Sequence, residues 1–349
     1  MNILTNHPAH FEVPEKLSCP QPTEERSIPR DHVRLLVSKG NGTIHHTRFS
    51  NLDRYLRAGD ILIVNTSATV NSAISVELPD GKQGRVHFSS WWSTTEWLVE
   101  IRASEGLKNV RWKEGRCGQV FNLPGNASLK LIRRYYRDTQ LLHLWIAEVK
   151  TGRDMPAYLD EHGLPISYRT DEHYPLSYYQ TLFSFHPGSA EMPSAARGFT
   201  PELVDRLLKK GVTITPILLH TGVSSLEENE APYPEYMEID PITVSLVNRA
   251  KVHGKRIIAV GTTVIRALES GADSDGRLKA FRGYTDLYIN GSYESKVADG
   301  LITGFHEPRA SHLHIIRSVA GNQRIEAAYK AAIAEKYYWH QFGDIHLIL

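Results

Sequence analysis

The sequence predicts an α/β main domain with a mostly parallel sheet that is interrupted by an inserted six-stranded β-barrel. In residues 151–349, apolar strand patterns alternate with helix patterns, which is typical of a largely parallel sheet. Residues 70–150 instead hold six short strands between tight turns such as PDGK and LPGN, the pattern of a small barrel or sandwich. A chain of 349 residues also exceeds the usual size of one domain. We therefore expect a discontinuous main domain, residues 1–69 and 151–349, around a barrel domain, residues 70–150.

The composition excludes several classes of protein. A formal net charge of +1 provides no overall field that attracts nucleic acid, so RNA binding would need a local basic patch. Cys19 and Cys117 are too far apart to suggest a disulfide framework, which favours a reducing, cytoplasmic setting. The pairs His45–His46 and His312–His314 do not converge on one metal, so no metal is expected. No run of about 18 apolar residues occurs, and we expect no membrane partner.

The main domain is predicted to begin after a proline-rich lead-in at residues 1–30. Two short strands at 34–38 and 44–49 flank the glycine turn KGNG. The next strand, at 60–64, is continuously apolar and runs directly into Asn65, which places this amide at the end of a buried strand.

The barrel region carries more basic than acidic residues, with 12 Lys and Arg against 8 Asp and Glu in residues 70–150. The basic residues include Arg133, Arg134 and Arg137, which neighbour Tyr135 and Tyr136. A basic strand with interleaved aromatic residues can hold RNA. It is more often a solvated barrel face, so the residues alone favour a plain surface while leaving RNA contact open.

The second part of the main domain alternates helices with strands. Helices are predicted after the N-cap residues Thr200 and Asp240, each of which is followed by a proline. Strands are predicted at 212–220 and 256–260, and a final amphipathic helix at 323–339. Ligands of parallel sheets bind at the carboxyl ends of strands, so the strand ends at His220 and Gly261 matter most.

The segment RIIAVGTTVIRALES leads from a buried strand straight into a helix through Gly261, Thr262 and Thr263. At such a joint the first helical N–H groups have no partner and the helix dipole is positive, which favours a carboxylate or phosphate. Gly261 allows a ligand to approach the backbone, and the two hydroxyls add donors. A packed strand-helix unit without a ligand is the alternative interpretation.

Other polar residues lie next to predicted strands: His220 with Gly222, Asp286, and Asp299 before LITGFH. A histidine at the end of a strand could be a general base, or a histidine at the core edge that bonds to the backbone. Glu235 could orient a base or bind an amine, or it could be a solvated loop acid.

Six ordered segments carry a family resemblance: RLLVSKGNGTIHHTRFSNLDRYLRAGDILIVN, YYQTLFS with PGSAEMPSAARGFTPELVDRLLKKGV, LLHTG, RIIAVGTTVIRALES, GYTDLYINGSYESKVADGLITGFHEPRAS and FGDIHLIL. In order and spacing they resemble the S-adenosylmethionine:tRNA ribosyltransferase-isomerase family of queuosine biosynthesis. The resemblance covers nearly the whole chain, and six ordered segments are specific where one short motif is not.

The resemblance implies the same fold and a particular reaction. The ribosyl part of S-adenosylmethionine, the co-substrate, moves onto the amine of 7-aminomethyl-7-deazaguanine in a tRNA anticodon and becomes an epoxycyclopentane, while adenine and methionine are released. A sulfonium acidifies the adjacent C5′–H, so a positioned base can form a carbanion before adenine leaves and the amine attacks. No metal or redox cofactor is implied.

Motif position and chemistry suggest roles in this reaction. His220 or His306 would be the base at C5′, and Asp286 and Asp299 would orient sugar hydroxyls or the incoming amine. The Gly261–Thr263 turn would take the methionine carboxylate or a ribose edge. The substrate-binding residues that the resemblance implies are Asn65, Tyr179, Gln180, Gly222, Glu235, Gly261, Thr262, Thr263, Arg266 and Thr303.

The chain departs from the family pattern mainly at its site segments. Ala68 and Ala73 replace two family arginines, which weakens phosphate or base contacts. Gly198 stands at a family histidine position and Gly304 at a family asparagine position. Framework segments such as FGDIHLIL hold, so we expect the S-adenosylmethionine half of the site to be kept and the acceptor half to be altered.

Two alternatives to the family reaction therefore stay open. One is a paralogue that processes S-adenosylmethionine with a small-molecule acceptor or none, as a lyase or isomerase, which the lost arginines and Gly198 favour. The other is a catalytically inactive nucleoside-binding protein that retains the fold.

Overall fold

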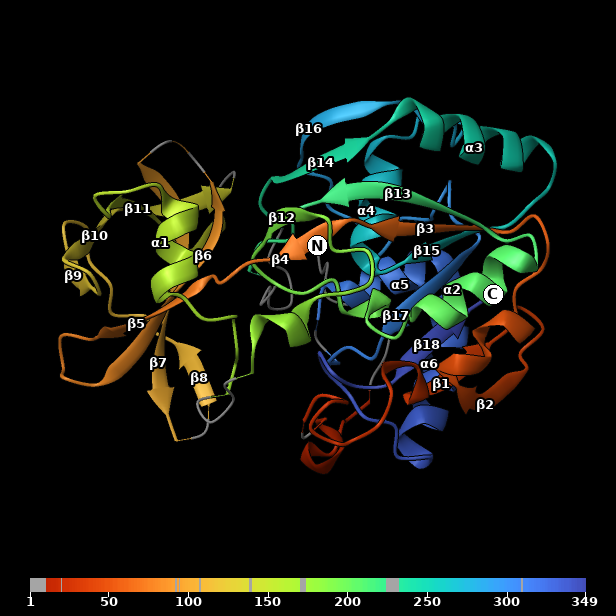
Figure 1. The fold of residues 1–349 in the computed structure, drawn as a ribbon, viewed down its shortest axis with the longest axis horizontal. Coiled ribbons are helices and arrows are strands. Elements are labelled where there is room, and N and C mark those ends of the chain that lie inside the picture. Colours follow the sequence, from red (N-terminus) through yellow and green to blue (C-terminus); the bar gives the residue numbers. More distant parts are fainter. Residues whose placement is uncertain are drawn as a thin grey trace, which may run out of the picture.

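The structure is a computed structural model that describes residues 11–349 except 20, 92, 94, 107, 138–139, 170–173, 224–231 and 309. A nine-stranded sheet with helices on its faces forms the main part, and a smaller antiparallel barrel lies beside it, to the left in Figure 1. The predicted fold class, an α/β domain with an inserted barrel, is confirmed.

The central sheet has a parallel middle and antiparallel flanks. In hydrogen-bonded order its strands are β16 (Phe281–Thr285), β14 (Glu235–Ile239), β13 (Thr213–Leu219), β3 (Ile61–Asn65), β15 (Ile257–Val260), β17 (Gly300–Gly304), β18 (Ile345–Ile348), β1 (Arg34–Ser38) and β2 (Ile44–Arg48). Strands β13, β3, β15 and β17 run parallel to one another. Strands β14 and β18, on either side of this group, are antiparallel to their inner neighbours. Four carboxyl ends therefore meet at one edge.

Helices cover both faces of this sheet. They are α2 (Pro201–Lys209), α3 (Pro241–Val252), α4 (Thr262–Ser270), α5 (His312–Ala320) and α6 (Asn322–Ala334), with short 3₁₀ helices at Glu15–Leu17, Arg30–His32, Phe49–Arg54, Leu176–Tyr179 and Ser194–Ala196. Successive side chains of a strand point to opposite faces. In β3, Ile61 and Ile63 accordingly pack in the layer with α3 to α6, whereas Leu62 and Val64 pack in the layer with α2. Within the described ranges, no helix combines the length and apolar character that a membrane span needs.

The helix starts follow their predicted caps. Thr200 Oγ1 accepts a hydrogen bond from Leu203 N at 3.3 Å, and Asp240 Oδ1 accepts one from Ile242 N at 2.7 Å. The last helix is shorter than predicted, since α6 ends at Ala334 and Lys336 takes a positive φ of 56°. That left-handed residue turns the chain back toward β18.

The barrel is a separate antiparallel unit. Its strands follow the order β5 (Ala73–Glu77), β6 (Gln83–Trp91), β7 (Glu96–Glu105), β11 (Gln140–Lys150), β10 (Ala127–Arg137) and β9 (Val120–Leu123), while β8 (Lys108–Arg111) pairs with β7. Apolar side chains such as Val86, Phe88 and Val99 fill its interior. Helix α1 (Met155–His162) packs into the same apolar cluster, so residues beyond 151 also contribute to the barrel core.

A third, two-stranded element connects the two parts. Strand β4 (Ser67–Thr69) pairs in parallel with β12 (His186–Ser189). It follows β3 directly and precedes β5, so the chain passes through it on the way from the sheet to the barrel, in orange in Figure 1. Residues next to this element lie at the carboxyl edge of the sheet.

Candidate active site

The carboxyl ends of the parallel strands bring several predicted site residues to one edge. Strand β3 ends at Asn65, and strands β13 and β15 end just before His220 and Gly261. At the end of β17, Thr303 lies three residues before His306. Because the four strands are parallel and adjacent, these residues share the edge at which α/β proteins bind ligands.

Asn65 uses its side-chain amide to hold this edge together. Its Nδ2 donates to Leu219 O at 2.8 Å, and its Oδ1 accepts from Leu219 N at 3.0 Å and from Ser67 N at 3.1 Å. The residue is 1% exposed. Asn65 therefore fixes the end of β13 and the start of β4, which is a positional role within the site.

His220 is held on three sides and remains half-buried. Its Nδ1 lies 2.7 Å from Ser67 Oγ, and its ring is near-parallel to Tyr236 at a centroid distance of 6.0 Å. A Cβ added at Gly188 would lie 2.6 Å from the His220 ring, so only glycine permits this close approach. Burial lowers the pKa of His220, nearby His186 lowers it further, and Glu238 opposes the shift. The imidazole is thus neutral at pH 7 and able to accept a proton.

Glu235 and Arg266 form a buried ion pair next to this histidine. Glu235 Oε1 also accepts from Gly222 N at 2.7 Å. The Arg266 guanidinium donates to backbone oxygens of residues 233, 285 and 287, at 3.2, 3.1 and 3.0 Å. Burial raises the pKa of Glu235, and the charge of Arg266 opposes that shift. The two predicted substrate-binding residues therefore brace α4 against the ends of β14 and β16.

Gly222 marks the joint between the site and the barrel. A Cβ added at Gly222 would collide with the hydroxyl of buried Tyr233, which bonds to Ser89 Oγ on β6. Ser89 Oγ also accepts from Val223 N at 2.8 Å. Gly222 is required here by close packing, and the barrel strand β6 is bonded directly to the segment that follows His220.

The start of α4 leaves its first backbone donors without partners among the described residues, as the strand-to-helix joint predicts. Gly261 has a φ of 105°, and its N–H donates to Ile302 O at 2.8 Å. The backbone N–H groups and hydroxyls of Thr262 and Thr263 make no hydrogen bond within the described part of the chain. Two backbone donors and two hydroxyls at a positive helix end form a site suited to a carboxylate.

His306 forms a pair that the sequence reasoning missed. Its ring stacks on His312, the first residue of α5, with centroids 4.7 Å apart and planes 12° apart, and its Nε2 lies 3.1 Å from Thr303 Oγ1. Burial, and then His312, lowers the pKa of His306 well below its usual value, and burial lowers the pKa of His312 to about 4. His306 and His312 are six positions apart across a loop, and this spacing matches neither the helix nor the strand period, so the sequence did not predict their contact. In the described residues no group of three or more metal-binding side chains occurs.

Tyr179 and Gln180 lie behind β4. The Gln180 amide accepts from Thr69 N at 3.1 Å and donates to Thr69 O at 2.8 Å, so it clamps the strand backbone. Tyr179 is 2% exposed and packs on Phe342 at a centroid distance of 5.4 Å. Both residues support the connecting element.

The two predicted catalytic aspartates lie at different edges. Asp286 is exposed directly after β16, which runs in the same direction as β13, so it sits at the outer end of the site edge. Asp299 precedes β17, and its carboxylate accepts from Ile257 N, at the start of β15, at 2.8 Å. A residue before a parallel strand lies at the amino edge. The structure therefore does not bring Asp299 together with His220 and His306, and its predicted catalytic role does not fit this position.

The departures from the family pattern have different structural settings. A Cβ added at Gly198 would lie 2.8 Å from the ring of buried Phe49, so that ring blocks a larger side chain. A Cβ added at Gly304 would meet no atom within 4 Å. Ala68 and Ala73 are 7% and 1% exposed, where β4 and β5 lead into the barrel.

The basic residues of the barrel divide into a buried and an exposed set. Arg102 and Arg111 bond to the buried carboxylate of Glu100, and the guanidinium of Arg102 lies 4.5 Å from the Tyr168 ring. Arg134 stacks on Trp145. The exposed basic residues near β10 are Lys113, Arg116, Lys130 and Arg133. The side chain of Arg137, which was predicted to belong to this face, lies outside the described residues.

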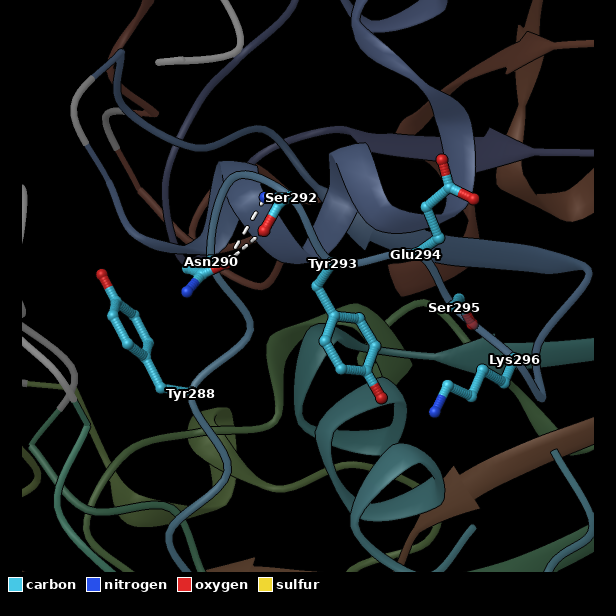
Figure 2. A pocket seen from close by; sticks show the side chains of 7 residues that line it. All are labelled: Tyr288, Asn290, Ser292, Tyr293, Glu294, Ser295 and Lys296. Carbon is cyan, nitrogen blue, oxygen red and sulfur yellow. Dashed lines mark hydrogen bonds between the residues drawn. The ribbon is translucent and has the colours of Figure 1, made fainter. Parts of the chain in front are cut away.

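An open depression of about 590 Å³ is lined by none of the predicted site residues. Its lining comes from residues 288–296, which pack over α4 through hydrogen bonds from Tyr293 and Ser295 to Glu269 at 3.0 and 2.7 Å. Figure 2 shows Asn290 and Ser292 hydrogen-bonded to each other, with Tyr288 and Glu294 pointing away from them. The depression is therefore not a candidate catalytic site.

Fold and site together define an α/β protein with polar side chains gathered at the carboxyl ends of its parallel strands, beside an inserted barrel. Residues 7–348 match the family described as queuosine biosynthesis protein, and the chain belongs to this family. The resemblance noted in the sequence is confirmed.

Curated relatives support the same family. Proteins named S-adenosylmethionine:tRNA ribosyltransferase-isomerase from Desulfitobacterium hafniense, Halothermothrix orenii and Aquifex aeolicus are 34%, 33% and 32% identical to the chain. Each comparison covers 97% of the chain and 98% of the relative. The crystal structure of S-adenosylmethionine tRNA ribosyltransferase from Thermotoga maritima matches with a TM-score of 0.54 and 26% identity, over 97% of this chain and 99% of that one.

Proposed function

We propose that the chain is an S-adenosylmethionine-dependent ribosyltransferase-isomerase of queuosine biosynthesis. It moves the ribosyl moiety of S-adenosylmethionine onto 7-aminomethyl-7-deazaguanine in tRNA and releases adenine and methionine. The observation that carries this proposal is an oriented, half-exposed His220 at a strand-end edge with an open helix start, in a chain that matches the family over residues 7–348. The names of the full-length relatives favour this reaction over a small-acceptor paralogue or an inactive binding protein.

We assign the base to His220. The sulfonium of S-adenosylmethionine acidifies the C5′–H, and a neutral imidazole at the site edge removes that proton. The electron pair left at C5′ drives the rearrangement of the sugar, adenine departs, and the amine of the acceptor completes the transfer. His306 suits this step less well, since it is stacked on His312 and its Nε2 faces Thr303.

The start of α4 supplies the contacts for the methionine part. The free N–H groups and hydroxyls of Thr262 and Thr263 would bind its carboxylate. Asp286, at the exposed outer end of the edge, would attract the incoming amine. Glu235, Arg266 and Gly222 form the wall that keeps these groups in place.

The barrel is our candidate for contacts with the tRNA backbone, through Lys113, Arg116, Lys130 and Arg133. Such contacts weaken steeply with added salt, because neutralised phosphates release counterions. The double variant Lys130→Glu/Arg133→Glu should weaken tRNA binding and flatten its salt dependence, whereas Lys209→Glu on α2 should leave both unchanged. Equal binding by the double variant and the wild type would remove the barrel from the tRNA interface. A tRNA substrate and the free thiols of Cys19 and Cys117 fit a cytoplasmic setting.

Mass spectrometry tests the function directly. The purified protein is incubated with S-adenosylmethionine, with and without tRNA that carries 7-aminomethyl-7-deazaguanine, and free adenine and methionine are measured. Release that depends on this tRNA supports the proposal. Release without tRNA indicates a small or absent acceptor, and the lack of any release contradicts the proposed reaction.

A further inference from the structure

We propose that Ser67 and Ser189 are positioning residues that hold His220 in the tautomer whose Nε2 is free to accept a proton. This inference rests on the proposed function, in which His220 is the base. It assigns a role to two hydroxyls that lie 122 positions apart in the sequence and meet only in the folded chain.

The hydroxyls form a short chain that ends at the imidazole. Ser67 Oγ lies 2.7 Å from His220 Nδ1 and 2.6 Å from Ser189 Oγ. Ser189 Oγ also accepts from Thr221 N at 3.0 Å. Both serines are fully buried, at 0% exposed, so bulk water does not replace these partners.

The donors and acceptors of the two serine hydroxyls link them to the function of His220 as a base. A neutral histidine with a free Nε2 carries its proton on Nδ1 and must donate it. Ser67 Oγ is the acceptor within reach, and the Ser67 hydroxyl can then donate its own hydrogen bond to Ser189 Oγ. The reverse order, in which Ser189 donates to Ser67 and Ser67 donates to Nδ1, would place the ring proton on Nε2, and the tautomer measurement below separates the two orders. After His220 takes the C5′ proton, the imidazolium still needs the same acceptor at Nδ1. In the order we propose, the two hydroxyls serve both the neutral and the protonated imidazole of the catalytic cycle, as an oriented partner does in a catalytic triad.

Backbone hydrogen bonds hold the two serine hydroxyls in position beside His220. Asn65 binds Ser67 N and both backbone groups of Leu219, the residue before His220. Thr221 N fixes Ser189 from the other side. The titratable and charged groups facing His220 are His186 on β12, and Tyr236 and Glu238 on β14, where Arg282 of β16 pairs with Glu238. None of these offers Nδ1 the acceptor that Ser67 provides.

Nitrogen NMR of the histidine rings at pH 8 tests the tautomer without substrate. His220→Gln identifies the His220 signal among the 17 histidines of the chain. The wild type should show His220 protonated at Nδ1, and Ser67→Ala should shift it toward the Nε2-protonated form. Ser38→Ala is the matched control. Ser38 Oγ on β1 lies 2.8 Å from buried His346 on β18, and both strands are separated from β13 by other strands of the sheet. An Nε2-protonated His220 in the wild type, or an unchanged tautomer in Ser67→Ala, overturns the proposal.

Kinetics test the consequence. Ser67→Ala should lower kcat roughly 10- to 100-fold, part of the 10²- to 10⁴-fold that a positioned base contributes, with little change in KM for S-adenosylmethionine. The acid limb of the pH profile should move to lower pH, since the imidazolium loses an acceptor, and Ser67→Thr should restore both properties. Ser189→Ala, which leaves the bond between Ser67 and His220 in place, should have a smaller effect in the same direction. An unchanged pH profile in Ser67→Ala contradicts the positioning role of Ser67. If the wild type shows the expected tautomer but no turnover, only the proposed function is contradicted.

Discussion

The two histidines at the ends of the parallel strands have different surroundings. His220, after β13, is half-exposed and bonds through Nδ1 to a serine hydroxyl, which leaves Nε2 on the open side. His306, after β17, is stacked on His312 and bonds through Nε2 to Thr303. Burial lowers the pKa of both, and both are half-buried, so they differ in the nitrogen that is bonded and in the stack of His306 on His312. A position at a strand end alone therefore does not make a histidine a base; which ring nitrogen is bonded and what the ring stacks on also matter.

Replacing the two histidines gives the largest expected contrast. His220→Gln should lower tRNA-dependent adenine release about 10³-fold, the loss expected for a positioned base. His306→Gln should lower it less than about 10-fold and act mainly on the thermal midpoint, since the stack on His312 is lost. His253→Gln, which alters an exposed histidine beyond the end of α3, is the matched control. Equal losses of adenine release for His220→Gln and His306→Gln would contradict the different roles of the two histidines.

The ion pair between Glu235 and Arg266 braces the His220 side through Gly222, and breaking it should change stability strongly. Glu235→Ala leaves a buried guanidinium without its carboxylate, which costs about 3–5 kcal/mol of unfolding free energy. Glu235→Gln retains an acceptor for Gly222 N and should cost clearly less. Urea unfolding measures both variants, and a loss below about 1 kcal/mol for Glu235→Ala would show that the pair is not structurally required.

Gly222 tests the link between the His220 side and the barrel. Gly222→Ala forces Tyr233 and Ser89 apart and should cost about 1–3 kcal/mol, the usual range for overpacking. Gly304→Ala, on the His306 side, adds a methyl group in open space and should stay within about 0.5 kcal/mol of the wild type. Thermal unfolding compares the two, and similar effects would contradict the packing difference between the two sides.

The smallest effect concerns acid stability on the His306 side. Burial lowers the pKa of His312 to about 4, so between about pH 6.5 and 4 the unfolded chain binds a proton that the folded chain does not. This stability is present above pH 6.5 and is lost as the pH falls toward 4. His312→Gln should flatten the slope of unfolding free energy against pH in this window. An unchanged slope would mean that His312 titrates alike in both states.

Much of the fold could be predicted from local sequence signals. Apolar strands such as 60–64, the caps Thr200 and Asp240, and the turns of the barrel each specify their element through nearby residues. The unpaired donors at the start of α4 could be predicted for the same reason, because a strand that meets a helix at Gly261 leaves the first helical N–H groups without partners.

The remaining features depend on contacts between distant segments. Ser67 and Ser189 meet only because β4 pairs with β12, and the stack of His306 on His312 requires a loop to fold back on α5. Charge counting could not show that Arg102 is buried against Glu100, since burial depends on what covers the barrel. The position of Asp299 could have been predicted from the sequence, because a residue that precedes a parallel strand lies at the amino edge of the sheet.

Loss of deuterium from C5′ of labelled S-adenosylmethionine measures the central claim most directly, since it follows the proton that the base removes. The wild type and His306→Gln should both exchange the label into water in the presence of the tRNA substrate, whereas His220→Gln should retain it. Exchange by His220→Gln at the wild-type rate would show that another group removes the proton and would contradict the assignment of His220 as the base.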